Sequence, residues 1–112
     1  MNLILCNRRY DVGLPNYYIG RPGPLGNPFR PKTKSLSERD RVCDEFDNHF
    51  KNNLSYYEPY IDEMIQAAIE YGSIQLVCFC SPLRCHGDTY LEHIKNTLLG
   101  MGYDPVIKRN ER

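Results

Sequence analysis

The sequence has no apolar stretch approaching the roughly 20 residues that a membrane-spanning helix needs, so we expect no membrane partner. It contains no internal repeat and no low-complexity tract. It also lacks both a G-x-x-x-x-G-K-[ST] phosphate loop and a G-x-G-x-x-G dinucleotide fingerprint. The formal net charge is zero, because 14 basic residues balance 14 acidic residues. Broad, salt-driven binding to duplex DNA needs many phosphate contacts, so this balance argues against it.

At 112 residues, the chain has the length of one domain (residues 1–112), which excludes an enzyme with a cleft between two domains. Its 41% hydrophobic and 25% charged residues are typical of a globular protein and exclude disorder. The apolar start, Met1 to Leu5, is too short for a secretory signal. Three of the five cysteines lie within eight residues, a pattern that suits reduced thiols or metal ligands better than extracellular disulfides. We therefore expect a cytoplasmic protein.

Short apolar segments and amphipathic helices alternate along the chain. We expect strands at Asn2–Cys6, near Tyr17–Ile19, at Ile74–Cys80 and around Val106 and Ile107. We expect helices after a Ser35 cap with Glu38 three residues later, from near Pro59 to Gly72, and after a Thr89 cap to Gly100 or Gly102. Strands separated by helices favour a mostly parallel sheet with about three helices packed on its faces. The predicted fold class is α/β, a small single-domain Rossmann-like sandwich.

Residues 20–31, the glycine-proline loop, read GRPGPLGNPFRP and are unsuited to regular secondary structure. Residues 1–37 carry six basic residues and one acidic residue, so an anionic ligand would be drawn to this part of the chain. Glycines permit close backbone approach, arginines grip anions, Asn27 offers a donor and an acceptor, and Phe29 can lie against a flat base. The candidate substrate-binding residues are Gly20, Arg21, Gly26, Asn27, Phe29 and Arg30. Alternatively, the loop is a rigid cover over the sheet.

Residues 78–88, CFCSPLRCHGD, gather cysteine and histidine between a predicted strand and the next helix. Three interpretations remain open. Cys78, Cys80, Cys85 and His86 can hold zinc, although adjacent side chains on a helix diverge by about 100°. Cys85 or Cys80 can instead be a reactive thiolate at a helix start. The cysteines can also be buried packing residues.

Asp88 follows this cysteine-histidine segment and is a candidate general base or a partner that orients His86. The candidate catalytic residues are therefore Cys85, His86 and Asp88.

The segments YIGRPGPLGNPF (residues 18–29) and CFCSPLRCHGD together resemble the family catalogued as domain of unknown function 4326, which occurs in bacteria and phages. The similarity extends from about Leu3 to Leu98. The position between the first two motif cysteines, often tryptophan in the family, is Phe79 here, which keeps an aromatic side chain. The resemblance implies a small cytosolic α/β domain with both motifs at one site, in the host cytoplasm if a phage encodes it. It implies no particular reaction.

Taken together, these features suggest an enzyme acting on a nucleotide, nucleoside or modified nucleobase, with zinc or a thiolate at the cysteine-histidine segment. The alternative is a non-catalytic module that binds nucleic acid or protein, with a structural zinc or a packed Cys/His corner. Both hypotheses require the two motifs to meet in space. The oligomeric state is not indicated by the sequence.

Overall fold

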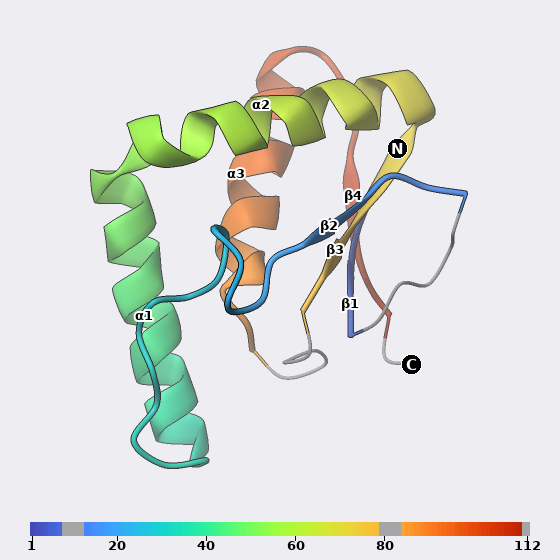
Figure 1. The fold of residues 1–112 in the computed structure, drawn as a ribbon. Helices are drawn as coiled ribbons and strands as arrows, with labels where there is room; N and C mark the ends of the chain where they lie inside the picture. Colours follow the sequence, from blue (N-terminus) through green and yellow to red (C-terminus); the bar gives the residue numbers. More distant parts are fainter. Residues whose placement is uncertain (8–12, 79–83, 111–112) are drawn as a thin grey trace.

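The computed structural model describes residues 1–7, 13–78 and 84–110 and has an α/β fold (Figure 1). Within these ranges the chain forms three helices and a four-stranded sheet in which every pairing is parallel. The elements are, in chain order, β1 (Asn2–Cys6), β2 (Asn16–Tyr18), α1 (Leu36–Asn52), α2 (Leu54–Tyr71), β3 (Ser73–Val77), α3 (Gly87–Gly100) and β4 (Val106–Asn110). The predicted fold class is confirmed.

The central strands carry the apolar core. The strand order is β2-β3-β1-β4, so β3 and β1 are flanked on both sides. Leu3 of β1 lies opposite Ile74 of β3, and both side chains are fully buried. The expected strand Ile74–Cys80 is therefore central, as its nearly continuous apolar composition indicates. The described strand ends at Val77, and residues 79 and 80 lie outside the described residues.

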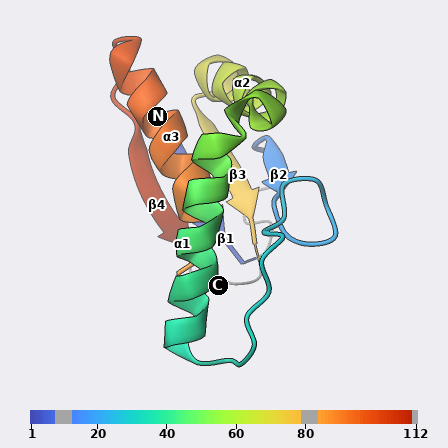
Figure 2. The ribbon, with the colours of Figure 1, turned by 90° about the vertical axis from the view of Figure 1, so that its left-hand side faces the viewer.

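The three helices lie over one face of the sheet (Figure 2). α2 packs on β3, α3 packs on β1 and β4, and α1 packs against the other two helices. As an outer element, α1 extends beyond the carboxyl ends of the central strands (Figure 1). No helix in the described ranges combines the length and apolar character needed to cross a membrane.

The predicted start is confirmed for α1 but is wrong for α2. Ser35 is the N-cap of α1, and its Oγ accepts a hydrogen bond from the Glu38 N–H at 3.2 Å, as predicted. By contrast, α2 begins at Leu54, so its predicted start near Pro59 is wrong. The Tyr57 side chain is only 2% exposed and packs on the phenylalanine rings of α1. This tertiary packing favours helical backbone ahead of the proline.

The third helix begins earlier than predicted. α3 starts at Gly87, so the predicted Thr89 cap is wrong, whereas the predicted end at Gly100 is confirmed. Thr89 lies in the first turn, where its hydroxyl contacts Asp47 Oδ1 at 3.4 Å. A Cβ at position 87 would lie 2.7 Å from Leu5 Cδ1. Glycine therefore lets α3 begin close against β1.

Candidate functional site

Both sequence motifs lie at the carboxyl edge of the sheet. Cys78 directly follows β3, and Cys85 and His86 directly precede α3. The glycine-proline loop follows β2. Because β2 and β3 are parallel neighbours, the chain leaves both strands at the same edge (Figure 1). Ligands of open parallel sheets bind at this edge.

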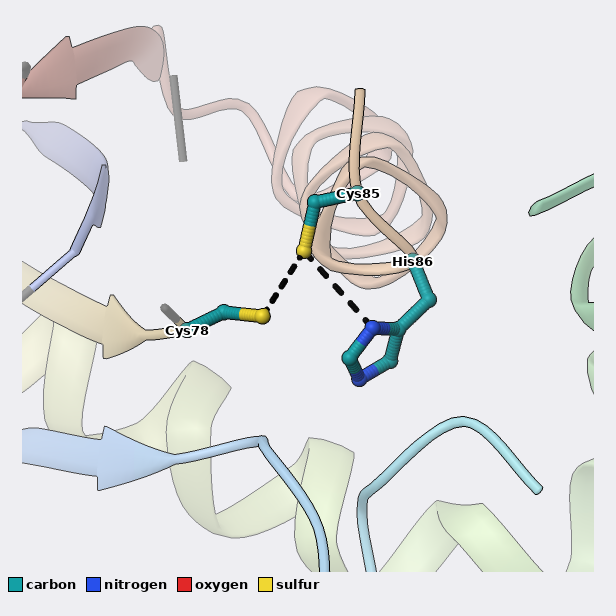
Figure 3. A group of neighbouring side chains, drawn as sticks. All are labelled: Cys78, Cys85 and His86. Carbon is teal, nitrogen blue, oxygen red and sulfur yellow. Dashed lines mark hydrogen bonds between the residues drawn. The ribbon is translucent and has the colours of Figure 1, made fainter. Parts of the chain in front are cut away.

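Three side chains converge there to form the cysteine-histidine cluster of Cys78, Cys85 and His86 (Figure 3). Cys85 Sγ lies 3.0 Å from Cys78 Sγ and 3.6 Å from His86 Nδ1. None of the three residues is more than 4% exposed. Their candidate ligand atoms lie within 4.8 Å of one another, so the cluster could hold a metal ion. Cys80, also predicted as a metal ligand, lies outside the described residues.

The backbone before α3 brings two adjacent side chains to one point. On a regular helix, neighbouring side chains diverge by about 100°, which would separate Cys85 from His86. Both residues precede the helix, which begins at Gly87. Their ligand atoms can therefore face each other (Figure 3), and the geometric objection to joint metal binding does not apply.

His86 fastens the glycine-proline loop to the cluster. Its Nε2 lies 2.6 Å from Ile19 O and 3.1 Å from Leu25 O. Carbonyl oxygens only accept hydrogen bonds, so Nε2 carries a proton, and in the neutral ring Nδ1 then carries none. Nδ1 is the atom that faces Cys85 Sγ. Metal-binding histidines commonly have this arrangement, with the second nitrogen donating to a backbone carbonyl.

The start of α3 stabilises negative charge on one of the two sulfurs. The Gly87 N–H donates a hydrogen bond to Cys85 Sγ at 3.3 Å. A helix start carries partial positive charge, which favours a thiolate over a thiol. Cys85 is thereby suited to act as a metal ligand or as a nucleophile.

Asp88 holds the turn that presents the cluster. Its Oδ2 accepts a hydrogen bond from the Cys85 N–H at 3.3 Å, and its Oδ1 pairs with Arg109 of β4. Asp88 is not among the described residues that line the cavity beside the cluster. The contacts of Asp88 are those of a positioning residue, and its predicted role as a general base stays a prediction.

A cavity of about 310 Å³ is lined by residues of both the cysteine-histidine cluster and the glycine-proline loop. All three cluster residues line it, and so do four of the predicted loop residues: Gly20, Arg21, Asn27 and Phe29. Two motifs that are distant in sequence therefore share one cavity. In the described part of the chain, Gly26 and Arg30 are not among the lining residues.

Two polar residues of the loop hold the loop itself in shape. Arg21 Nη1 donates hydrogen bonds to Asn27 O at 3.1 Å and to Phe29 O at 3.2 Å. Asn27 Nδ2 donates to Val42 O of α1 at 3.0 Å, and Asn27 Oδ1 accepts from the Phe29 N–H at 2.9 Å. These bonds shape the cavity wall. Direct contact of Arg21 or Asn27 with a substrate stays a prediction.

The loop glycines accommodate neighbouring side chains of the loop. A Cβ at Gly20 would lie 2.4 Å from Tyr18 Oη. A Cβ at Gly26 would lie 3.0 Å from both Arg21 Cγ and Gly20 O. Neither glycine has a positive φ. Close packing, and not an unusual backbone angle, therefore accounts for glycine at these two positions.

Much of the cavity wall lies outside the candidate site residues predicted from the sequence. The additional lining residues are Tyr18, Pro31, Thr33, Lys34, Ser35, Arg39, Val42, Cys43 and Arg84. Most of them belong to α1 or to the segment that leads into it. The Ser35 capping pattern locates the start of this helix in the sequence, but no local pattern places that start beside the cluster.

Arg84 connects the segment before the cluster to α1. Its guanidinium lies 3.2 Å from Asp40 Oδ1 and 2.7 Å from Asp44 Oδ1. The hydrogen bond with Asp44 is the main cause that raises the pKa of Arg84. Two carboxylates of α1 thus hold this cationic side chain next to Cys85.

Tyr90 supplies a second attachment for the glycine-proline loop. Its hydroxyl is buried and donates a hydrogen bond to Leu25 O at 2.7 Å, and burial raises the pKa of Tyr90 so that the hydroxyl stays protonated. We expect Tyr90→Phe to lower the free energy of unfolding by about 1 kcal/mol, the usual net value of one such bond. Urea denaturation would measure this, with Tyr103→Phe on the surface as a near-neutral control. Equal stabilities of the two variants would contradict an anchoring role.

The comparisons with known proteins agree with the motifs. The matching family model covers residues 6–96, which include both the glycine-proline loop and the cysteine-histidine cluster. No curated protein and no solved structure matches the chain. Since the match covers far more than half of the sequence, the chain belongs to the family described as Domain of unknown function (DUF4326).

Proposed function

We propose that this chain is a cytoplasmic enzyme that acts on a nucleotide, nucleoside or modified nucleobase. The observation that carries the proposal is the cavity of about 310 Å³ lined by both family motifs. Small-molecule sites typically have volumes of about 300–1,000 Å³, so this cavity suits one compact ligand. Its position at the carboxyl edge of a parallel sheet is the usual place for such a site.

The cavity wall has groups that suit a ligand with a flat ring and polar substituents. Phe29 contributes an aromatic ring, which is held edge-on against His49 with ring centroids 5.6 Å apart. Nucleobases stack on aromatic rings of this kind. Thr33 and Ser35 add hydroxyl groups, which can both donate and accept hydrogen bonds.

The proposal includes a zinc ion held by Cys78, Cys85 and His86. Zinc favours thiolate and imidazole ligands, and bonds of about 2.3 Å in tetrahedral geometry place two sulfurs about 3.8 Å apart. The 3.6 Å separation of Cys85 Sγ and His86 Nδ1 already suits joint binding. The two sulfurs, now 3.0 Å apart, would have to separate slightly. The donor set and its burial therefore fit zinc.

Three protein ligands are the number found in catalytic zinc sites, which keep a fourth position open. All three residues line the cavity, so a zinc ion held by them would lie beside a ligand bound there. A zinc ion in such a site acts as a Lewis acid and lowers the pKa of a bound water. The protein contributes the fixed orientation of the ligands: His86 is held by two backbone carbonyls, and Cys85 Sγ by the Gly87 N–H.

Elemental analysis tests the metal. We expect protein produced with zinc in the medium to contain one zinc ion per chain, and Cys85→Ser to lose it because serine is a poor zinc ligand. Cys43→Ser is the matched control, since Cys43 is also buried and lines the cavity but lies outside the cluster. Wild-type protein that stays free of zinc after reconstitution would contradict the metal site.

Cys80→Ser distinguishes a catalytic zinc from a structural one. Retention of zinc in this variant supports a three-ligand site that is open to the cavity. Loss of zinc indicates a closed four-ligand site of the structural type, which favours the non-catalytic module.

Ligand-induced stabilisation tests the substrate class. Nucleobases, nucleosides and nucleotides would be screened by the rise in melting temperature that binding produces. We expect members of this panel to stabilise the wild type and to stabilise Phe29→Ala less, each shift being measured against the same variant without ligand. If oligonucleotides alone stabilise the protein, with strong salt dependence, the result favours a nucleic-acid-binding module and contradicts the proposed enzyme.

A further inference from the structure

One part of the cavity wall concentrates positive charge. Four cationic side chains line the cavity: Arg21, Lys34, Arg39 and Arg84. No aspartate or glutamate is among the lining residues in the described ranges. Like charges around a concave surface reinforce one another and attract an anion.

Two of these four cations already have partners within the protein. Arg21 donates hydrogen bonds to two carbonyls of its own loop. Arg84 pairs with two aspartates of α1. The two aspartates offset the positive charge of Arg84. Arg21 uses its Nη1 to hold its own loop. Lys34 and Arg39 are the remaining two.

Arg39 has hydrogen-bonding capacity that its surroundings do not use. Its Nε is buried and has no hydrogen-bond partner among residues 1–7, 13–78 and 84–110. Its Nη1 makes only a long contact of 3.5 Å with Arg84 O. A guanidinium keeps its charge in proteins, and leaving a buried N–H without an acceptor costs free energy. A ligand in the cavity would bind the terminal nitrogens of this guanidinium, because the Nε itself has almost no accessible surface.

Lys34 and the start of α1 add to the same wall. Within the part of the chain that the structure describes, no carboxylate forms an ion pair with Lys34. Ser35, the N-cap of α1, also lines the cavity. The helix start contributes partial positive charge, although Glu38 in the first turn offsets part of it.

We propose that Arg39 and Lys34 form a phosphate subsite, so that the ligand of this cavity is a nucleoside monophosphate and not a free nucleoside or base. The guanidinium of Arg39 would donate from its two terminal nitrogens, Nη1 and Nη2, to two phosphate oxygens, a forked geometry for which arginine is suited. The cavity volume of about 310 Å³ limits the ligand to a mononucleotide. The nucleoside half of this inference rests on the proposed function, whereas the phosphate half rests on the cationic wall.

Isothermal titration calorimetry tests the phosphate subsite and the nucleoside specificity separately. The probes are the 5′-monophosphates of adenosine, guanosine, cytidine, uridine and thymidine, the five matching nucleosides, and inorganic phosphate. We expect the best monophosphate to bind the wild type at least about tenfold more tightly than its nucleoside, as charge-assisted hydrogen bonds predict. Arg39→Ala should weaken monophosphate binding by about 10- to 100-fold and leave nucleoside binding unchanged. Lys32→Ala, a nearby exposed cation outside the lining, is the matched control.

The other outcomes are equally distinct. Equal affinity for nucleosides and monophosphates, or equal weakening of both by Arg39→Ala, would overturn the phosphate subsite while the proposed function stands. If no nucleoside or nucleotide binds, but inorganic phosphate binds and is lost in Arg39→Ala, the subsite stands and the nucleotide proposal fails. No binding by any probe overturns both. Arg39→Lys, which keeps the charge but not the fork, should retain part of the affinity, and melting curves would confirm that each variant is folded.

Discussion

Replacing Phe46 with alanine is expected to lower the free energy of unfolding by about 4 kcal/mol, the range found when a buried aromatic ring is removed. Phe46 of α1 is fully buried. Its ring centroid lies 5.1 Å from that of His86, 5.4 Å from that of Tyr90 and 5.9 Å from that of Tyr57. These contacts join α1 to both other helices and to the cluster. Denaturation in urea would measure the loss.

The control is Leu36→Ala, also on α1, because Leu36 is 67% exposed and a surface change of this kind usually stays within about 0.5 kcal/mol. Phe46→Leu keeps part of the apolar volume and should cost less than the alanine variant, so it remains measurable if Phe46→Ala does not fold. A loss below about 1 kcal/mol in Phe46→Ala would contradict the packing of α1 described above.

His86→Ala is expected to lower the free energy of unfolding by about 3 kcal/mol, because it removes a buried ring and leaves a buried carbonyl without its hydrogen-bond donor. His86 is 4% exposed, and its Nε2 lies 2.6 Å from Ile19 O and 3.1 Å from Leu25 O. Leu25 O would keep the hydrogen bond from Tyr90. The variant should also lose the proposed zinc, which would be measured on the same sample.

His93→Ala provides the comparison, since His93 packs on Phe50 with ring centroids 5.3 Å apart but lies outside the cluster. This variant should lower the free energy of unfolding less than His86→Ala does and should leave the zinc content unchanged.

Combining His86→Ala with Tyr90→Phe tests the shared attachment at Leu25 O. The two losses should not be additive if both residues hold the same carbonyl. Additive losses would show that the two residues stabilise the protein independently and would contradict a shared attachment at Leu25 O.

Periodicity predicts those elements whose apolar residues must face the core. β3 is central because the segment that contains it is mostly apolar, and α1 begins after Ser35 because that side chain caps the helix locally. The predicted starts of α2 and α3 are wrong because distant contacts decide them. Tyr57 extends α2 ahead of Pro59 by packing on α1, and Gly87 lets α3 begin against Leu5 of β1.

The cysteine-histidine cluster and part of the loop could be predicted because their chemistry is concentrated in short motifs. The contribution of Arg39 could not, because one arginine on an amphipathic helix has no local feature that distinguishes it from a solvated surface residue. Its importance follows from its position in the cavity lining beside Lys34. The roles of Arg21 and Asn27 in holding the loop likewise depend on bonds that only the folded loop forms.

The sequence by itself determined the α/β class, the central strand and the identity of the sulfur and imidazole groups, because hydrophobic periodicity and residue chemistry are local properties. Only the tertiary structure decided that Cys85 and His86 face one point, that the glycine-proline loop lines the same cavity, and that Lys34 and, from α1, Arg39 add positive charge to its wall. These arrangements depend on parallel strands ending at one edge and on helices packed over one face. Such contacts join residues far apart in the chain, and no short segment encodes them.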